Sequence, residues 1–340
     1  MTVSVLDPRV DPEPFGWTDF QRRHHLHAPW DYALLTMEAW LSRHPPLLVI
    51  ARSGNVIVAA MAVLVCAPAR AGRYARPRPF LGGRLLPRVA QVYQPWLGGE
   101  GFVLADGGAE VLRAMERAVR SRLGPAMVGM IYRNVPESLV PLVSGRGRLV
   151  RPVQPAASVL ENRWGSEDEW LASLSRNRRK NVRKVDRLVA ADPTLVVRSG
   201  AGRSDVDGAE LAGLLRTHRT KFGTQRFDPR TPVGAEYLSA VVRRPDVHTL
   251  TYSDVDGRVL AFSTYLDHPV APVLQFWASR ADGARAHLYF DCHARAIRHV
   301  IASGRKELSA GRAMFEQKQT LGFGARPMCV VGVPGPVVGR

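Results

Sequence analysis

The stretch that decides the fold reads Val273-Leu-Gln-Phe-Trp-Ala-Ser-Arg280-Ala-Asp-Gly283-Ala-Arg-Ala-His-Leu288-Tyr-Phe-Asp-Cys-His. An apolar run passes through a turn that contains glycine into a segment, 288–301, that we expect to be a helix. Ala302-Ser-Gly304 ends that helix, and a short strand at 306–309 and a second helix beginning near Ala313 follow. Strand, turn, helix, strand and helix predict one α/β unit. Its turn places backbone N–H groups and a helix N-terminus where an anionic ligand can bind.

The rest of the chain indicates two halves of similar organisation. Each half contains two strands joined by a turn with glycine, at 47–65 and at 248–266. Further elements are predicted by periodicity: helices at 30–43, 109–123, 206–222 and 234–243, and a strand at 126–132. Residues 67–95 are rich in Pro, Gly and Arg and predict a long loop. A cluster of Gly, Arg and Pro at 145–157 predicts the boundary between domains 1–150 and 151–340.

Composition limits the class of protein and of partner. At 340 residues the chain is long enough for about two domains, and 46% hydrophobic residues indicate a globular protein. The net charge of +17 attracts polyanions such as RNA, nucleotide cofactors or membrane phosphates. The same charge could also reflect an Arg-rich genome, so it does not decide between partners.

Cysteine spacing and hydropathy argue against several classes. Cys66, Cys292 and Cys329 lie far apart without metal-ligand spacing, so we expect neither a disulfide framework nor a metal site, and a reducing cytoplasm. The N-terminus lacks the basic start and apolar core of a signal peptide. The longest apolar run, 56–67, is shorter than the roughly 20 residues that cross a bilayer. We therefore expect a soluble cytoplasmic protein without stable membrane insertion.

The densest charge lies at 176–187, where seven cations face a single acidic residue, Asp186. Apolar residues recur every three or four positions from Leu171 to Val189, so the block is predicted to lie on an amphipathic helix that Ser166 and Glu169 begin as a capping box. On such a helix four cations share a face, with Arg179 and Lys184 beside it: Arg176, Lys180, Arg183 and Arg187. This face could follow a phosphate backbone, and the alternative is a solvated helix surface.

The turn Arg280-Ala-Asp-Gly283-Ala-Arg285 differs by one residue from the Q/R-x-x-G-x-G/A pyrophosphate loop of GNAT acyltransferases. Arg285 stands where that loop has Gly or Ala, which lets backbone amides approach the phosphates. Arg280 and Gly283 are the candidate phosphate-binding residues of this turn. An ordinary turn between a strand and a helix is the alternative.

Three motifs resemble the Fem-like peptidyltransferases, which consist of two GNAT-type domains in tandem. The first is the L-S-x-x-x-R-x-x-x-R-K block from Leu174 to Lys184. The second is the segment from Leu288-Tyr-Phe to Gly304, and the third is Glu316-Gln-Lys318-Gln-Thr-Leu-Gly322-Phe323. The resemblance covers most of 170–327 and implies an α/β fold of two tandem GNAT-like domains, with mixed sheets flanked by helices. Gln317 and Leu321 replace aromatic residues of the better-known Fem enzymes, which leaves the substrate open.

The resemblance also implies an activity and a set of site residues. It implies an acyltransferase that forms an amide on an amine-bearing acceptor, a cell-wall precursor or a small metabolite. The donor would be aminoacyl-tRNA, with tRNA as the partner and no bound cofactor. Lys318 and Glu316 carry over as site residues, and Gly322 and Phe323 as structural positions. Lys318 could stabilise an oxyanion and Glu316 could accept a proton, but two residues apart they do not share a helix face. Tyr289 and His287 are further candidates for proton transfer.

Two other functions remain open. The first is the same chemistry with an acyl-CoA donor, and the second is a basic module that binds polyanions without catalysis. RNA dependence separates the two enzymes, and binding that survives Lys318→Ala without any acyl transfer would identify the module.

Overall fold

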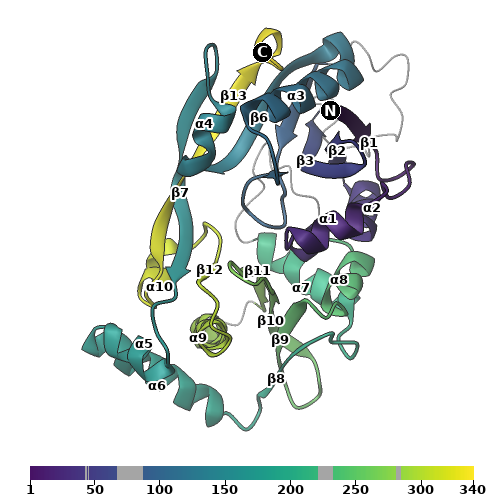
Figure 1. Ribbon diagram of the computed structural model, residues 1–340. Helices are drawn as coiled ribbons and strands as arrows, with labels where there is room; N and C mark the ends of the chain where they lie inside the picture. Colours follow the sequence, from purple (N-terminus) through teal and green to yellow (C-terminus); the bar gives the residue numbers. More distant parts are fainter. Residues whose placement is uncertain (43, 45, 67–86, 221–232, 281–284) are drawn as a thin grey trace. The chain divides into compact units, whose positions relative to one another are not determined.

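A computed structural model describes the chain except for residues 43, 45, 67–86, 221–232 and 281–284 (Figure 1). The described residues form two compact units. Unit 1 contains residues 1–154 and 327–340, and unit 2 contains residues 155–220 and 233–326. The C-terminal residues thus belong to the same unit as the N-terminal half.

Unit 1 is a mixed sheet with helices on both faces. Its strands follow the order β1 (Thr2–Leu6), β2 (Pro46–Ser53), β3 (Val56–Cys66), β4 (Arg88–Val92), β6 (Met127–Pro136) and β13 (Gly324–Pro334), and β5 (Phe102–Leu104) pairs with β3. Neighbouring strands are antiparallel except for the parallel pair β4 and β6. The helices are α1 (Trp17–Arg23), α2 (Tyr32–Leu41), α3 (Ala109–Leu123) and α4 (Val140–Val143).

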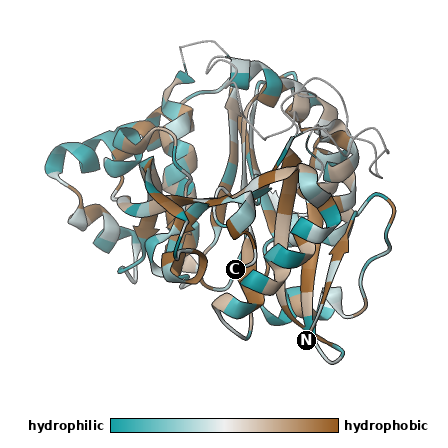
Figure 2. Cartoon of the chain, turned by 90° about the horizontal axis from the view of Figure 1, so that it is seen from above, coloured by the Kyte–Doolittle hydropathy of each residue, from teal (hydrophilic) through white to brown (hydrophobic). Residues whose placement is uncertain are grey.

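Alternation along the strands of unit 1 produces two apolar faces. Val49 and Met61 pack with α3 residues such as Met115 on one face, while Leu48 and Ile50 pack with α1 and α2 residues on the other. Figure 2 shows the same pattern, with hydrophobic residues concentrated in the strands and hydrophilic residues along the outer helix surfaces.

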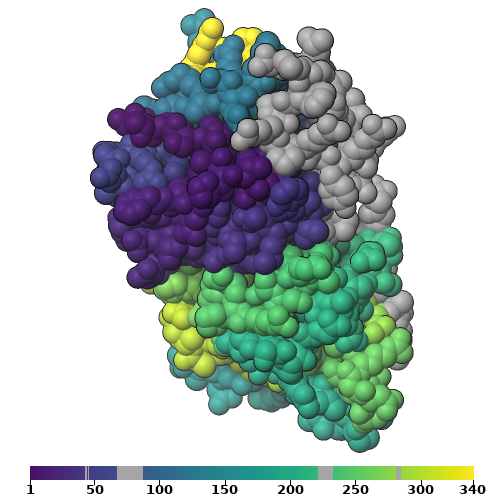
Figure 3. Space-filling model, turned by 90° about the vertical axis from the view of Figure 1, so that its right-hand side faces the viewer, coloured from purple at the N-terminus to yellow at the C-terminus, as the bar shows by residue number. Residues whose placement is uncertain are grey.

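Unit 2 has the strand order β7 (Leu149–Glu161), β12 (Glu307–Ser309), β11 (Val273–Ser279), β10 (Val259–Leu266), β9 (Val247–Ser253) and β8 (Val196–Ala201). Its helices are α5 (Glu167–Ser173), α6 (Arg176–Ala190), α7 (Gly208–Thr220), α8 (Ala235–Val242), α9 (His287–Ala302) and α10 (Phe315–Gln319). Helix α9 covers one face of this sheet and packs against α6, while α7 and α8 cover the other face. In Figure 3 the residues of α7 and α8, in green, lie at the surface of unit 2.

The structure confirms the predicted α/β fold with mixed sheets flanked by helices and corrects several elements. Strand β4 lies inside the predicted loop 67–95, of which residues 67–86 lie outside the described residues. Strand β7 occupies much of the predicted linker 145–157. It was not predicted because its first residues are largely exposed and carry no apolar alternation. The single helix predicted across 171–189 is two helices, since Ser175 accepts a hydrogen bond from the Arg178 N–H and starts α6 anew. Ser166 caps α5 as expected.

Candidate acyl-transfer site

The sheet of unit 2 opens between two neighbouring parallel strands. β11 and β12 pair through one residue pair, Val273 and Ser309, and the chain leaves β12 directly afterwards. β11 continues to Ser279 with β10 on its other side. The edge of β11 beyond Val273 therefore has no strand partner among the described residues. Such an edge offers backbone N–H and C=O groups to an extended ligand.

Lys318 lies at this opening, inside the protein. Its side chain is 3% exposed, and its Nζ donates hydrogen bonds to the Ala310 carbonyl and, at 2.6 Å, to the Ala313 carbonyl. Both carbonyls belong to the segment that leaves β12. Burial lowers the pKa of Lys318 to about 8. An ammonium group has three N–H donors, so one remains without a partner among the described residues and is available to an oxyanion.

Tyr289 and His293 lie on one face of α9, because they are separated by four residues. The Tyr289 ring packs edge-on against Trp277 of β11 at 5.5 Å and lies 4.3 Å from the His293 ring, between centroids. Tyr289 thus lies against the strand whose edge is open. Burial raises the pKa of its phenol, which keeps the proton for donation.

His293 contacts Tyr289, and the charge of Lys318 acts on it. Its Nδ1 lies 2.8 Å from the Tyr289 carbonyl oxygen, and burial together with the Lys318 charge lowers its pKa to about 3, although the Tyr289 carbonyl opposes this. A neutral imidazole in contact with a carbonyl holds its proton on Nδ1 and leaves Nε2 as an acceptor. His293 was not among the predicted site residues. Its place four residues after Tyr289 was the signal that could have identified it.

Glu316 lies away from this cluster. It is exposed and lines a separate cavity with Gln317 and Thr320, whereas Lys318 is buried. The expectation that residues 316 and 318 do not share a helix face agrees with this arrangement. Lys318 alone of the two points into the fold.

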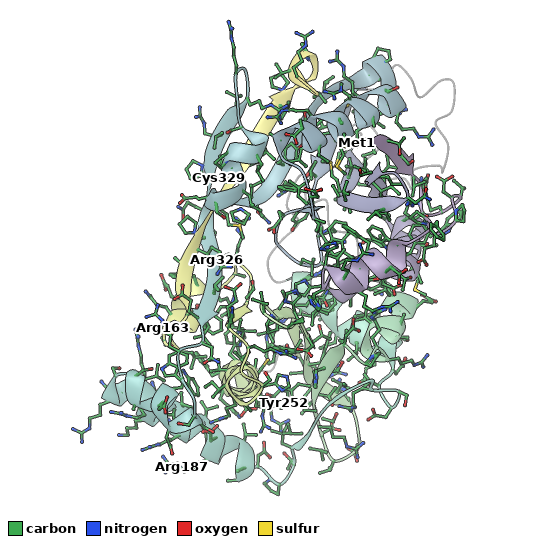
Figure 4. All side chains as sticks on the ribbon, in the orientation of Figure 1. Met1, Arg163, Arg187, Tyr252, Arg326 and Cys329 are labelled. Atoms are coloured by element: carbon green, nitrogen blue, oxygen red, sulfur yellow. The ribbon has the colours of Figure 1, made fainter. Side chains whose placement is uncertain are left out.

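Most cationic side chains of α6 are exposed to solvent. Arg176, Lys180 and Arg183 are exposed, and Arg179 is partly buried with its Nη1 3.4 Å from the Ala172 carbonyl oxygen. Asp186, the one acidic residue of α6, is paired with Arg298 of α9 at 2.8 Å. It therefore does not neutralise the exposed cations. Figure 4 shows the long side chains of α6, with Arg187 labelled, pointing outward.

The predicted phosphate-binding turn is only partly described, since Gly283 lies outside the described residues. The Arg280 Nε donates to the Val259 carbonyl at 2.8 Å, and its Nη2 lies 3.4 Å from Glu210. Arg285 donates to the Thr194 hydroxyl at 2.8 Å. Phosphate binding by Arg280 would require it to exchange these partners, and that role stays a prediction.

Gly322 and Phe323 fix the segment that follows α10. Gly322 has a φ of +101°, a conformation that side chains disfavour. Phe323 is buried in the core of unit 2, with its ring 6.2 Å from that of His293. Trp170 of α5 donates its indole N–H to the Leu321 carbonyl at 3.1 Å. These contacts hold α10 and therefore position Lys318.

The three cysteines are free and buried, and no cluster of three or more His, Cys, Asp or Glu that could hold a metal occurs in the described part of the chain. None of the described helices is long and apolar enough to cross a membrane.

Part of the chain matches a known protein family in sequence. Residues 176–319 match the family described as acetyltransferase (GNAT) domain. No curated protein matches the chain in sequence.

Solved structures with the same fold span nearly the whole chain. The C-terminal domain (DUF2156) of a putative lysylphosphatidylglycerol synthetase from Agrobacterium fabrum is 13% identical, covers 95% of this chain and 92% of that chain, and gives a TM-score of 0.58. FemX is 10% identical over 99% of this chain and 98% of that chain, with a TM-score of 0.57. L-PGS from Bacillus licheniformis is 10% identical over 96% and 92%, with a TM-score of 0.54. At these identities the likeness establishes the fold.

The motifs from Leu174 to Phe323, the open edge of β11 and the family match converge on one part of the molecule. Residues 176–319 are similar to the acetyltransferase (GNAT) domain family, and the chain has the Fem-like, tandem GNAT-like fold.

Proposed function

We propose that this protein transfers an aminoacyl group from aminoacyl-tRNA to an amine and forms an amide. The observation that carries the proposal is the cluster of Tyr289, His293 and Lys318 beside the open edge of β11. The acceptor would be a cell-wall precursor or a small metabolite with a free amine.

The reaction assigns a separate task to each group. The acceptor nitrogen attacks the ester carbonyl, a C–N bond forms, and the carbonyl oxygen becomes an oxyanion near the Lys318 ammonium. The C–O bond to the tRNA ribose then breaks, and the ribose oxygen takes a proton that Tyr289 supplies. The amine loses one proton, which restores the phenol through solvent. His293 is a positioning residue between the other two, because its ring contacts Tyr289 and its pKa responds to Lys318.

The exposed cations of α6 favour an RNA donor. Arg176, Lys180 and Arg183 carry charge that no acidic side chain of the helix neutralises, since Asp186 is paired with Arg298. A cationic face of this kind attracts a phosphate backbone over its length. Arg179 and Arg280 are additional proposed donor contacts, together with Gly283.

A second candidate uses acyl-CoA as donor with the same acceptor chemistry. The match of residues 176–319 to an acetyltransferase domain favours it. The attack on a thioester carbonyl and the role of Lys318 would be the same, and the leaving group would be a thiol.

The two donors are distinguished by incubating the protein with a small-molecule extract and labelled donor. An amide survives mild alkali, whereas an aminoacyl ester does not, so transfer is measured as alkali-stable label. With labelled aminoacyl-tRNA we expect such a product, and RNase added beforehand should abolish it. Product from acetyl-CoA that is insensitive to RNase would replace the first donor with the second. Binding of tRNA without product from either donor would instead indicate a non-catalytic polyanion-binding module.

A further inference from the structure

A cavity of about 510 Å³ lies between α6, α9 and α10. Its volume is typical of a small-molecule site. The apolar residues that line it come from α6, from α9 and from the turn after α10: Val182, Val185, Leu188, Phe290, Ala294 and Leu321. Leu188 is 44% exposed although it is a large apolar residue, so the cavity opens to solvent beside an apolar lip.

This cavity is distinct from the acyl-transfer cluster. His287, Phe290 and Ala294 line the cavity and recur at helical spacing on one face of α9, whereas Tyr289 and His293 lie on another face. On α10, Glu316 and Gln317 line the cavity, while the Lys318 ammonium is directed to the carbonyls of the segment after β12.

The rim of the cavity is polar and carries more positive than negative charge. Arg178 and Lys184 are exposed cations of α6, and neither forms an ion pair within the described part of the chain. Glu316 is the one carboxylate among the lining residues. The His287 Nε2 is buried and has no hydrogen-bond partner among the described residues. A buried polar atom without a partner costs free energy that a ligand atom could recover.

The cations at this rim differ from those of the proposed tRNA surface. Residues 178, 181, 182, 185 and 188 line the cavity along one side of α6, and Lys184 lines it at the border of that side. Arg176, Lys180 and Arg183 recur along another side, at a spacing of three or four residues. One helix therefore presents two binding faces that adjoin at Lys184.

We infer that this cavity binds a single acyl chain that carries an anionic head group. Its apolar residues are aliphatic apart from Phe290, and Asn181, Gln317 and Thr320 are the neutral polar residues of the lining. The aliphatic surface offers no hydrogen bonds to a sugar or a base. It favours an alkyl chain, which gains free energy in proportion to the apolar area that it buries. A phosphate or carboxylate at the rim accepts hydrogen bonds from Arg178 and Lys184, and from His287 when its Nε2 carries the proton. The amphiphile is either soluble or part of a membrane leaflet.

The test is calorimetric titration of the full chain with dodecyl phosphate below its micelle concentration. Inorganic phosphate and dodecyl maltoside serve as probes that lack the chain or the charge. We expect dodecyl phosphate to bind at least about tenfold more tightly than either probe. Leu188→Asp places a charge at the apolar lip without disturbing the core, because this side chain is already half exposed. It should weaken binding by about tenfold or more, and Arg178→Ala with Lys184→Ala should weaken it several-fold.

Lys180→Ala is the matched control, since it removes one cation from the other face of the same helix. Its affinity should equal that of the wild type. A second assay distinguishes a soluble amphiphile from a lipid of a membrane leaflet. It compares binding to vesicles of phosphatidylglycerol with phosphatidylcholine and to vesicles of phosphatidylcholine alone. Binding to either the soluble amphiphile or the anionic vesicles, lost in Leu188→Asp, supports the site and identifies its source. Binding to neither, or equal binding by Leu188→Asp and the wild type, overturns it. The assay involves no acyl transfer, so it stands or fails independently of the proposed function.

Discussion

Lys318 is a buried ammonium group whose partners are backbone carbonyls, which cannot neutralise it. Burial lowers its pKa to about 8, so the group is mostly charged at pH 7 and loses its charge as the pH rises through 8. If its charge stabilises the oxyanion, the rate of transfer should fall about tenfold for each pH unit above 8. The measurement is the pH profile of single-turnover transfer. Lys318→Met should leave a residual rate that does not fall above pH 8. If the rate of this variant falls above pH 8 as it does in the wild type, Lys318 does not stabilise the oxyanion.

Tyr289 offers a prediction that separates chemistry from packing. Tyr289→Phe keeps the ring that packs against Trp277 and His293 and removes only the hydroxyl. We expect the turnover rate to fall about 10²-fold with little change in donor affinity or in thermal stability, because proton donation is lost while the contacts remain. The matched control is Tyr237→Phe, a buried tyrosine of α8. A wild-type rate in Tyr289→Phe would assign the proton to another group.

A buried ion pair in unit 1 should determine the stability of that unit. Glu116 accepts hydrogen bonds at 2.7 Å from Arg148, from the Tyr132 hydroxyl and from the Gly339 N–H. Glu116→Gln leaves the Arg148 charge buried without its carboxylate. We expect a loss of about 3–5 kcal/mol in the free energy of unfolding, measured with urea. Glu137→Gln, at an exposed position, should change it by less than about 0.5 kcal/mol. Equal effects of the two substitutions would contradict a stabilising role for the buried pair of Glu116 and Arg148.

Sequence reasoning identified some of these residues and could not identify others. Lys318 and Tyr289 belong to motifs that lie within one α/β unit, so local spacing was sufficient. The arrangement of Glu316 and Lys318 on different sides also follows from helical periodicity. The role of His293 depends on Lys318, which lies on another helix, and the partners of Glu116 lie up to 223 residues away. Contacts of that kind leave no periodic pattern in the sequence.

Among the elements, the proposed tRNA-binding role of α6 can be measured separately. Arg176, Lys180 and Arg183 are exposed, and their replacement by Gln removes three positive charges from one face. We expect tRNA affinity to fall and the slope of log affinity against log salt to decrease by about 2–3, since each phosphate contact contributes roughly 0.7–0.9.

The control for that variant removes the same charge elsewhere. Arg23, Arg122 and Arg258 are exposed residues outside α6, and their replacement by Gln gives the same net charge. The salt dependence of this control should stay close to that of the wild type. If both variants lose the same affinity, tRNA is attracted by net charge alone and α6 is not a binding face.

The elements themselves were predictable where one side is buried. α3 and β11 were predicted from periodicity and apolar runs, and their bounds agree with the structure. β7 was missed because most residues of its first half are exposed, and the break between α5 and α6 was missed because Ser175 acts as a cap within a continuous apolar pattern. The return of β13 to unit 1 was missed because strand pairing at long separation has no local signal.

At the scale of the whole molecule, the tandem GNAT-like fold is shared with FemX and with L-PGS. Fold alone does not determine the donor or the acceptor. The candidate acyl-transfer cluster and the exposed cations of α6 both belong to unit 2, as does the apolar cavity. Unit 2 therefore contains the described residues on which the proposed aminoacyl transfer depends.

The measurement that tests this claim most directly compares wild type with Lys318→Met in one experiment. Labelled aminoacyl-tRNA is bound at physiological salt, and the alkali-stable amide is followed in a single turnover. We predict equal tRNA affinity and a rate at least about 10²-fold lower in Lys318→Met, because the loss of an oxyanion donor affects the transition state rather than binding. Equal rates in the two proteins, or no amide from charged tRNA in the wild type, would contradict the account.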